Sequence, residues 1–275
     1  MISLEGFYDI HIHTSPDVRP RKMDDIDTAQ DAYQEKMKGI VLKSHVSSTA
    51  GRAALAEKQV PGIKVFGSLS LNDPVGGINP FAVEAALKMG AKIVWLPTIS
   101  AQNHKRFHGE EGGITFLDMN KDLEIKLLAV LELVRDEDVA LGTGHISKEE
   151  IKVVVEYARQ LKLPKIIITH PEVPWIELSA AEQKELSGEG TFFERCFAST
   201  FEVGGGVPIE KIIRDIREVG FQSTVISTDF GADVLARPVD GYKGFLQALI
   251  DAGFDETQLA VMGKENPAYL LSCNQ

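Results

Sequence analysis

Residues 8–14 read Tyr-Asp-Ile-His-Ile-His-Thr, an alternation of apolar and polar residues that carries two histidines one position apart. Alternation indicates a β-strand, in which side chains two positions apart leave the backbone on the same side. His11 and His13 therefore point in one direction and can share one metal ion. With seven histidines in 275 residues, such a pair arises by chance in roughly one of six such sequences, so its interpretation depends on where the other ionisable residues fall.

The same arrangement recurs along the chain, as an apolar run that ends in polar residues and is followed by a helical pattern. Two predicted helices begin at capping-box sequences, Ser147-Lys-Glu-Glu150 and Ser179-Ala-Ala-Glu182. Predicted strands span residues 8–14, 39–45, 64–71, 92–98, 139–145, 165–170, 191–197 and 224–229. Predicted helices include residues 24–39, 80–90, 123–135, 147–161, 209–216, 241–252 and 266–271, with another that begins at residue 179.

Eight strands that alternate with helices predict a (β/α)8 TIM barrel in which residues 1–275 form a single domain. The strands are nearly continuous apolar runs, as parallel strands are when helices cover their sheet. The alternative is a doubly wound open sheet, but no G-x-G-x-x-G phosphate loop follows an early strand. The glycines at 204–206 come late and fit a turn after the seventh strand.

Composition and charge restrict the partners that this protein can have. The net charge of −11 argues against nucleic acid and anionic membranes. Cys196 and Cys273 are far apart and lack C-x-x-C spacing, which predicts neither a disulfide framework nor a zinc knuckle. The chain has no secretion-signal pattern and no apolar run of about 18 residues. We therefore expect a cytoplasmic protein that acts on a small molecule. Assembly into a homo-oligomer is compatible with this composition.

Ionisable residues stand at the C-terminal ends of five predicted strands. Active sites of TIM barrels are built at this end, so these side chains are expected to converge on one mouth. A single histidine or aspartate at a strand end is more often a capped loop residue than a ligand, but five such strand ends favour a shared site. The residues are His11 and His13 after the first strand, Lys43 and His45 after the second, His145 after the fifth, His170 after the sixth and Asp229 after the eighth.

The order His-x-His, His, His and Asp on strands one, five, six and eight resembles the amidohydrolase superfamily of metal-dependent hydrolases. Residues 266–271, Asn-Pro-Ala-Tyr-Leu-Leu, resemble the Asn-Pro-Ala-x-Leu-Leu closing helix that is common in that superfamily. Within it, the chain is similar to cytosolic amidohydrolase-like proteins that have no established substrate.

The resemblance implies a ligand set with one departure from the two-metal pattern. His11, His13 and Asp229 would hold one divalent ion, and His145 and His170 a second. In one-metal variants, His145 would join the first set and His170 would act as base or substrate contact. Two-metal members carry a bridging carboxylated Lys or a Glu at the end of strand four, where this chain reads Leu-Pro-Thr at residues 96–98.

Three residues could compensate for the missing bridge. Glu194 could supply a carboxylate, although an ion pair with Arg195 is an equal alternative. Lys43 could be carboxylated, although an amine that binds substrate is the preferred interpretation. His104 could reach over the mouth, or could be a solvated loop histidine.

Imidazoles with one carboxylate suit Zn²⁺, and Mn²⁺, Fe²⁺ and Co²⁺ are alternatives. The expected reaction is hydrolysis of an amide, lactone or phosphate ester by an activated water, with Asp229 as general base. The alternatives are a metal-dependent decarboxylase of the same superfamily and a metal-binding protein without turnover.

Two loops at the predicted mouth are unusually basic for so acidic a chain, and they include Arg19 and Arg106. With His45, His104, Lys43 and Arg52 they predict a positive rim that would bind a small anionic substrate. The segment from Gln102 to Thr115 is long for a βα loop and rich in glycine. We expect it to be a lid that closes over the metal.

Overall fold

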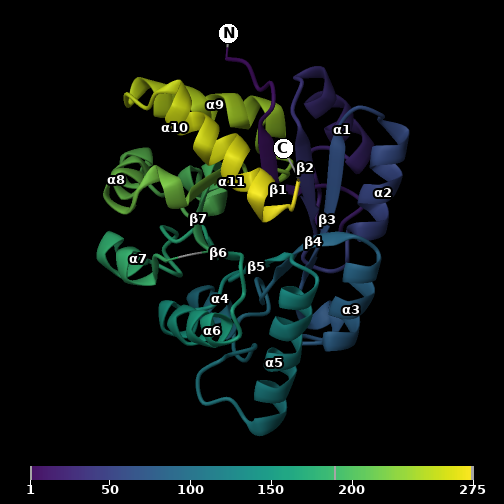
Figure 1. Cartoon of the computed structure of the whole chain (residues 1–275), viewed down its shortest axis with the longest axis vertical. Helices are drawn as coiled ribbons and strands as arrows, with labels where there is room; N and C mark the ends of the chain where they lie inside the picture. Colours follow the sequence, from purple (N-terminus) through teal and green to yellow (C-terminus); the bar gives the residue numbers. More distant parts are fainter. Residues whose placement is uncertain (1, 189, 274–275) are drawn as a thin grey trace.

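Eight parallel strands in sequential order form the centre of the computed structural model, which describes residues 2–188 and 190–273. Helices surround the strands (Figure 1), and the predicted single-domain (β/α)8 TIM barrel is confirmed. The strands are β1 (Tyr8–His13), β2 (Gly39–Lys43), β3 (Lys64–Ser70), β4 (Ala91–Trp95), β5 (Ala140–Gly142), β6 (Ile166–Thr169), β7 (Thr191–Cys196) and β8 (Thr224–Ser227).

The helices largely follow the predicted order, and both predicted capping boxes are present, at Ser147 with Glu150 and at Ser179 with Glu182. The α-helices are α1 (Asp25–Gln34), α2 (Ala50–Gln59), α3 (Pro80–Lys88), α4 (Gln102–Phe107), α5 (Lys121–Asp136), α6 (Lys148–Gln160), α7 (Ala180–Leu186), α8 (Ile209–Val219), α9 (Pro238–Asp251), α10 (Glu256–Ala260) and α11 (Asn266–Leu270). Short 3-10 turns are η1 (Asp73–Val75), η2 (Phe197–Thr200), η3 (Glu202–Gly204) and η4 (Phe221–Ser223), and η5 (Val261–Glu265) is a π-helical turn. None of the described helices is long and apolar enough to cross a membrane.

Several strands are shorter than predicted, because their last polar residues leave the sheet. Residues 139–145 were expected to be one strand, but β5 ends at Gly142 and His145 lies in the turn beyond it. The segment from Gln102 to Thr115 is also not a plain loop, since it begins with the short helix α4. These differences keep the side chains at the same end of the barrel.

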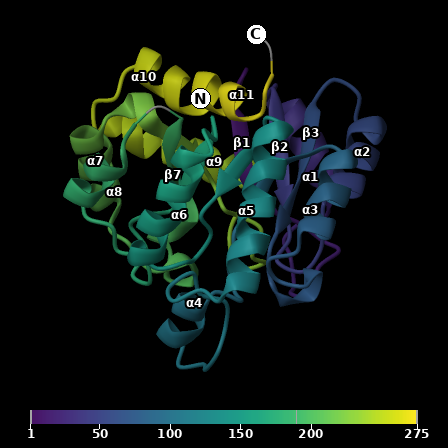
Figure 2. The ribbon, with the colours of Figure 1, turned by 60° about the horizontal axis from the view of Figure 1, so that its bottom comes forward.

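Two apolar layers hold the barrel together. One lies between the strands and the surrounding helices, and the other fills the barrel interior. The inner layer includes Ile10, Trp95 and Ile167, and Ala268 and Leu270 of α11 pack against it. The closing helix therefore seals one end of the barrel, and Figure 2 shows α10 and α11 at the opposite end of the molecule from α4.

The barrel closes between β1 and the segment after β8 through a few individual bonds. The backbone N–H of Asp229 donates to the carbonyl of His11 at 2.8 Å, and the N–H of His13 donates to the carbonyl of Phe230 at 2.8 Å. Beneath them, the buried Asp9 carboxylate accepts from the Thr228 hydroxyl at 2.5 Å and from its backbone N–H at 3.0 Å. These bonds fix the position of Asp229 relative to the two β1 histidines.

Gly231 is expected to be indispensable to this closure. Its φ is +135°, and a Cβ built there would lie 1.8 Å from the His13 carbonyl oxygen. Gly231→Ala should lower the free energy of unfolding by about 2–4 kcal/mol, measured by urea denaturation, because strain and overpacking act together. Gly51→Ala is the control, since that helical position has open space and should be neutral or stabilised by up to about 1 kcal/mol. Equal effects of both substitutions would contradict this account.

Candidate metal centre

All seven histidines of the chain line one cavity of about 970 Å³ at the C-terminal end of the strands. Their rings contact one another, with centroids 4.6 Å apart for His13 and His45 and 4.9 Å apart for His145 and His170. The seven are His11, His13, His45, His104, His108, His145 and His170. Segments from five different parts of the barrel contribute them, so the fold brings together all of the predicted imidazole groups.

His11, His13 and Asp229 form the tightest group of potential ligands at the mouth. The Nε2 atoms of His11 and His13 lie 3.0 and 3.1 Å from the same oxygen, Oδ1 of Asp229. The β1 alternation points both imidazoles the same way, and Asp229 has a positive φ of +53° that turns its side chain toward them. One donor atom from each residue lies within 4.8 Å of the others, a separation that one divalent ion can bridge.

The electrostatics of these three residues suit a cation. Burial lowers the pKa of His13 to about 3, so its imidazole is neutral and offers a lone pair. Burial opposes ionisation of Asp229, but His11 and His13 outweigh it and hold the pKa of this carboxyl well below its usual range. Burial also disfavours a charged His11. The Asp229 carboxylate is the main group that outweighs this effect, and it raises the pKa of the imidazole. A proton and a metal ion would therefore compete for the His11 imidazole.

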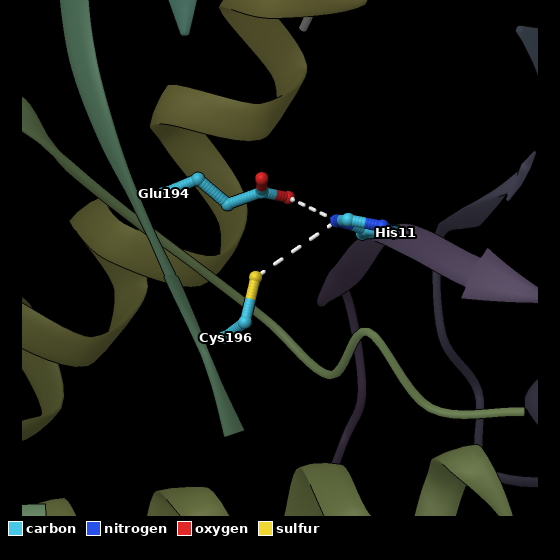
Figure 3. A group of neighbouring side chains, drawn as sticks. All are labelled: His11, Glu194 and Cys196. Atoms are coloured by element: carbon cyan, nitrogen blue, oxygen red, sulfur yellow. Dashed lines mark hydrogen bonds and ion pairs between the residues drawn. The ribbon is translucent and has the colours of Figure 1, made fainter. Parts of the chain in front are cut away.

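Glu194 and Cys196 of β7 approach the other ring nitrogen of His11 (Figure 3). His11 Nδ1 lies 3.1 Å from Oε1 of Glu194 and 3.8 Å from Sγ of Cys196. The alternative ion pair of Glu194 with Arg195 does not form, because neighbouring strand residues point to opposite sides and Arg195 pairs with Glu172. Glu194 is therefore directed into the barrel, beneath the cavity.

Lys43 and Trp95 form the floor beside His11. The fully buried Lys43 places Nζ 2.9 Å from Nε2 of His11 and 4.2 Å from the centre of the Trp95 ring. Burial lowers the pKa of this lysine, although Asp229 and Glu194 oppose the effect. Trp95 ends β4, and Gly142 leaves space for its ring, because a Cβ there would lie 2.1 Å away. An indole thus stands where β4 ends, and no carboxylate does.

His145 and His170 lie on a separate wall of the cavity. Among the described residues, neither belongs to a group of three donors close enough to hold an ion. Burial lowers the pKa of His170 to about 4, and its buried Nδ1 has no hydrogen-bond partner in the described chain. His145 directs Nδ1 at Nδ1 of His104, 2.9 Å away. His145 and His170 thus lie side by side without a third donor among the described residues, and a second ion at this pair stays a prediction.

The predicted substrate contacts are only partly brought together. His45 is buried at the cavity with Nδ1 2.9 Å from the Thr98 hydroxyl. Arg19 lines the cavity, whereas the exposed Arg106 is not among its lining residues. Arg52, which we expected in the rim, instead makes two 2.7 Å bonds to Asp25 and holds the loop after β1.

The segment from Gln102 to Thr115 forms one side of the cavity, and its closure over the metal stays a prediction. His104, Phe107, His108 and Glu110 line the cavity from this segment. Asn103 of α4 donates to the carbonyl oxygens of His145 and Trp175 at 3.2 and 2.5 Å, which fastens the segment to the loops after β5 and β6.

Sequence reasoning missed Trp175, whose ring lies at the centre of the histidine wall. Its ring centroid is 5.7 Å from those of His104 and His145 and 5.9 Å from that of His170. The signal that could have identified it is an aromatic residue five positions after a strand-end histidine, in a loop of the catalytic face.

A family model described as "Family of unknown function (DUF6282)" matches residues 6–194. No curated protein matches the sequence. Among solved structures, a lactonase from Listeria monocytogenes has a TM-score of 0.64 at 14% identity and covers 100% of this chain and 97% of its own. A candidate 2-pyrone-4,6-dicarboxylic acid hydrolase from Pseudomonas putida has a TM-score of 0.63 at 15% identity, with 98% of both chains covered.

A 2,6-dihydroxybenzoate decarboxylase from Rhizobium has a TM-score of 0.60 at 13% identity and covers 98% of this chain and 99% of its own. These structural neighbours are enzymes of the amidohydrolase superfamily, mostly metal-dependent hydrolases. The resemblance to that superfamily is confirmed at the level of the fold.

The neutral state of His170 predicts a pH dependence of stability in the metal-free protein. Its pKa of about 4 lies below the ordinary value of 6.5, so the unfolded chain binds more protons between these values. The His170 contribution to the free energy of unfolding should therefore fall as pH drops from 6.5 to 4, by up to about 1.4 kcal/mol per pH unit. Urea unfolding at several pH values should give a shallower slope for His170→Asn than for the wild type. Parallel slopes would show that His170 is not buried in its neutral form.

Proposed function

The chain belongs to the family of unknown function DUF6282, and we propose that it is a metal-dependent hydrolase whose ion is held by His11, His13 and Asp229. The observation that carries this proposal is the convergence of two histidine Nε2 atoms on one Asp229 oxygen, at 3.0 and 3.1 Å. Two imidazoles and a carboxylate are the protein ligands of many catalytic zinc sites, which leave a position for water. The adjoining cavity of about 970 Å³ gives substrate access to that position.

Zn²⁺ suits this donor set best, and Mn²⁺, Fe²⁺ or Co²⁺ could replace it. When bound, the ion lowers the pKa of water toward about 7 and polarises the bond under attack. Asp229 is ionised and faces the ligand position, so it accepts the proton of the attacking water and passes it to the leaving group. His170 is neutral and acts as a second base or a substrate contact, and Lys43 donates a hydrogen bond to a substrate oxygen.

The walls of the cavity favour a small, flat, anionic substrate. Trp175 and Phe107 provide aromatic surface, with the rings of His104 and His145 beside them. Arg19 on the rim supplies positive charge. A lactone that carries a carboxylate combines these features, and the fold similarity to the candidate 2-pyrone-4,6-dicarboxylic acid hydrolase agrees with this choice.

Metal-dependent decarboxylation is the second candidate function. The observation in its favour is that β4 ends at Trp95 without a carboxylate. Among the described residues, the two groups of three donors share His11 and do not form a bridged pair. The fold similarity to the 2,6-dihydroxybenzoate decarboxylase also supports this candidate reaction. A metal protein without turnover is less consistent with a group of only three protein donors beside a cavity of about 970 Å³.

Elemental analysis after saturation with Zn²⁺ should give one equivalent per chain. His13→Ala and Asp229→Ala should lose most of this ion because each removes one of three ligands, whereas His170→Ala should retain it. Two equivalents in the wild type that fall to one in His170→Ala would establish a two-metal centre instead. A wild type that binds no Zn²⁺ or Mn²⁺ would refute the proposal.

Substrate turnover should separate the two reactions. The Zn²⁺-loaded protein should release protons from 2-pyrone-4,6-dicarboxylate as its ring opens, and Asp229→Asn should be slower by at least about 10²-fold because the general base and one ligand of the ion are both lost. Release of CO2 from 2,6-dihydroxybenzoate, without hydrolysis of carboxylated lactones, would favour the decarboxylase.

A further inference from the structure

We propose that Glu194 is a positioning residue, which holds His11 in the tautomer and orientation that present Nε2 to the metal ion. This role rests on the proposed function, since it concerns the same ion. Glu194 would not itself be a ligand, in contrast to the ligand role predicted from the sequence.

The contacts of Glu194 support this role. Its side chain is completely buried, and Oε1 accepts from His11 Nδ1 at 3.1 Å and from the Ser227 hydroxyl at 2.9 Å. Figure 3 shows its carboxylate directed at the His11 ring. The buried Ser227 in turn lies 3.4 Å from the Cys196 thiol, so side chains from β7 and β8 fix the carboxylate in place.

The chemistry of imidazole decides which nitrogen faces which partner. A neutral imidazole has one nitrogen with a free lone pair and one that carries hydrogen. His11 Nε2 is the atom that faces Asp229, together with Nε2 of His13. If Nε2 binds the ion, Nδ1 must carry the hydrogen and donate it, and Glu194 is the acceptor. A carboxylate in this position also makes the imidazole a stronger ligand.

The competing interpretation is an ion held by His11 Nδ1, Glu194 and Cys196. These three donors also lie within 4.8 Å of one another, and a set of nitrogen, oxygen and sulfur ligands suits Zn²⁺. Such an ion would need the Nδ1 lone pair of His11. A neutral His11 could then no longer serve the group with His13 and Asp229, so the two sites exclude each other. We favour the site at the mouth, because the cavity reaches it.

The location of Glu194 adds a mechanical reason. β1 meets the β8 side of the barrel through a few individual bonds, and His11 stands in that part of β1. The Glu194 contact ties the His11 ring across to β7 below the ion. Loss of this contact would remove the acceptor that keeps the hydrogen on Nδ1 and one of the contacts that orient the ring, so the Nε2 lone pair would be less well directed at the ion.

The first test is the Zn²⁺ affinity of the full chain, measured by competition with a chromophoric chelator. Glu194→Gln and Glu194→Ala should bind one Zn²⁺ about 10- to 100-fold more weakly than the wild type. Glu150→Gln is the matched control, a buried carboxyl whose partners are Ser147, Thr115 and Phe116, and it should keep wild-type affinity. Circular dichroism establishes that each variant is folded, and Ser227→Ala, which leaves the carboxylate but removes its donor, should give a smaller loss.

The second test replaces Zn²⁺ by Co²⁺ and records the absorption spectrum. A positioning role predicts no thiolate-to-cobalt charge-transfer band in the near ultraviolet. A strong band in the wild type that disappears in Cys196→Ser would overturn the proposal in favour of the ion at Glu194 and Cys196.

The outcomes separate the two levels of inference. Wild-type affinity in Glu194→Gln, with loss of the ion in His13→Ala, would refute the positioning role and leave the proposed metal site intact. A wild type without any Zn²⁺ affinity would overturn both.

Discussion

The backbone hydrogen bonds that close the barrel between β1 and the segment after β8 are the constraint on which the site depends. They join Asp229 to His11 and Phe230 to His13, both at 2.8 Å. Because they are main-chain bonds, they fix the backbone positions of Asp229, His11 and His13 independently of the side chains. Asp9 supports them from below by accepting hydrogen bonds from the Thr228 hydroxyl and backbone N–H, and burial raises the pKa of its carboxyl to about 7. The candidate metal centre therefore depends on the closure of the barrel between β1 and the segment after β8.

Most of the fold and part of the site could be predicted from the sequence, because the signals that define them are local. Strand periodicity and helix caps are local, so the eight β/α units and the strand-end positions of His11, His13 and Asp229 could be predicted. The choice of partners is not local. Glu194 and Arg195 are neighbours in the chain but face opposite sides of β7, and only the twist and register of the barrel decide which one meets His11. For the same reason the sequence could not reveal that Trp175 reaches the histidine wall.

The cavity also explains how so acidic a chain can offer neutral nitrogen ligands. Burial lowers the pKa of His13 to about 3 and those of His104 and His170 to about 4, so desolvation has the largest effect on each of them. Arg52 is a contrasting case. This basic residue near the mouth donates hydrogen bonds to Asp25 and to two carbonyl oxygens, and so holds a loop. Net charge therefore says little about the field inside the site, which depends on which groups are paired and dehydrated.

The closure between β1 and the segment after β8 also has a consequence for the unfolded chain. Its side-chain bond joins Asp9 to Thr228, residues that are 219 positions apart. An ion held by His11, His13 and Asp229 would clasp the same two strands, and so would act as a removable cross-link that closes a very long loop. Cross-links of this kind limit the disorder available to the unfolded chain, and their effect grows slowly with loop length. The ligand set that activates water would thereby also determine whether the two ends of the sheet stay joined.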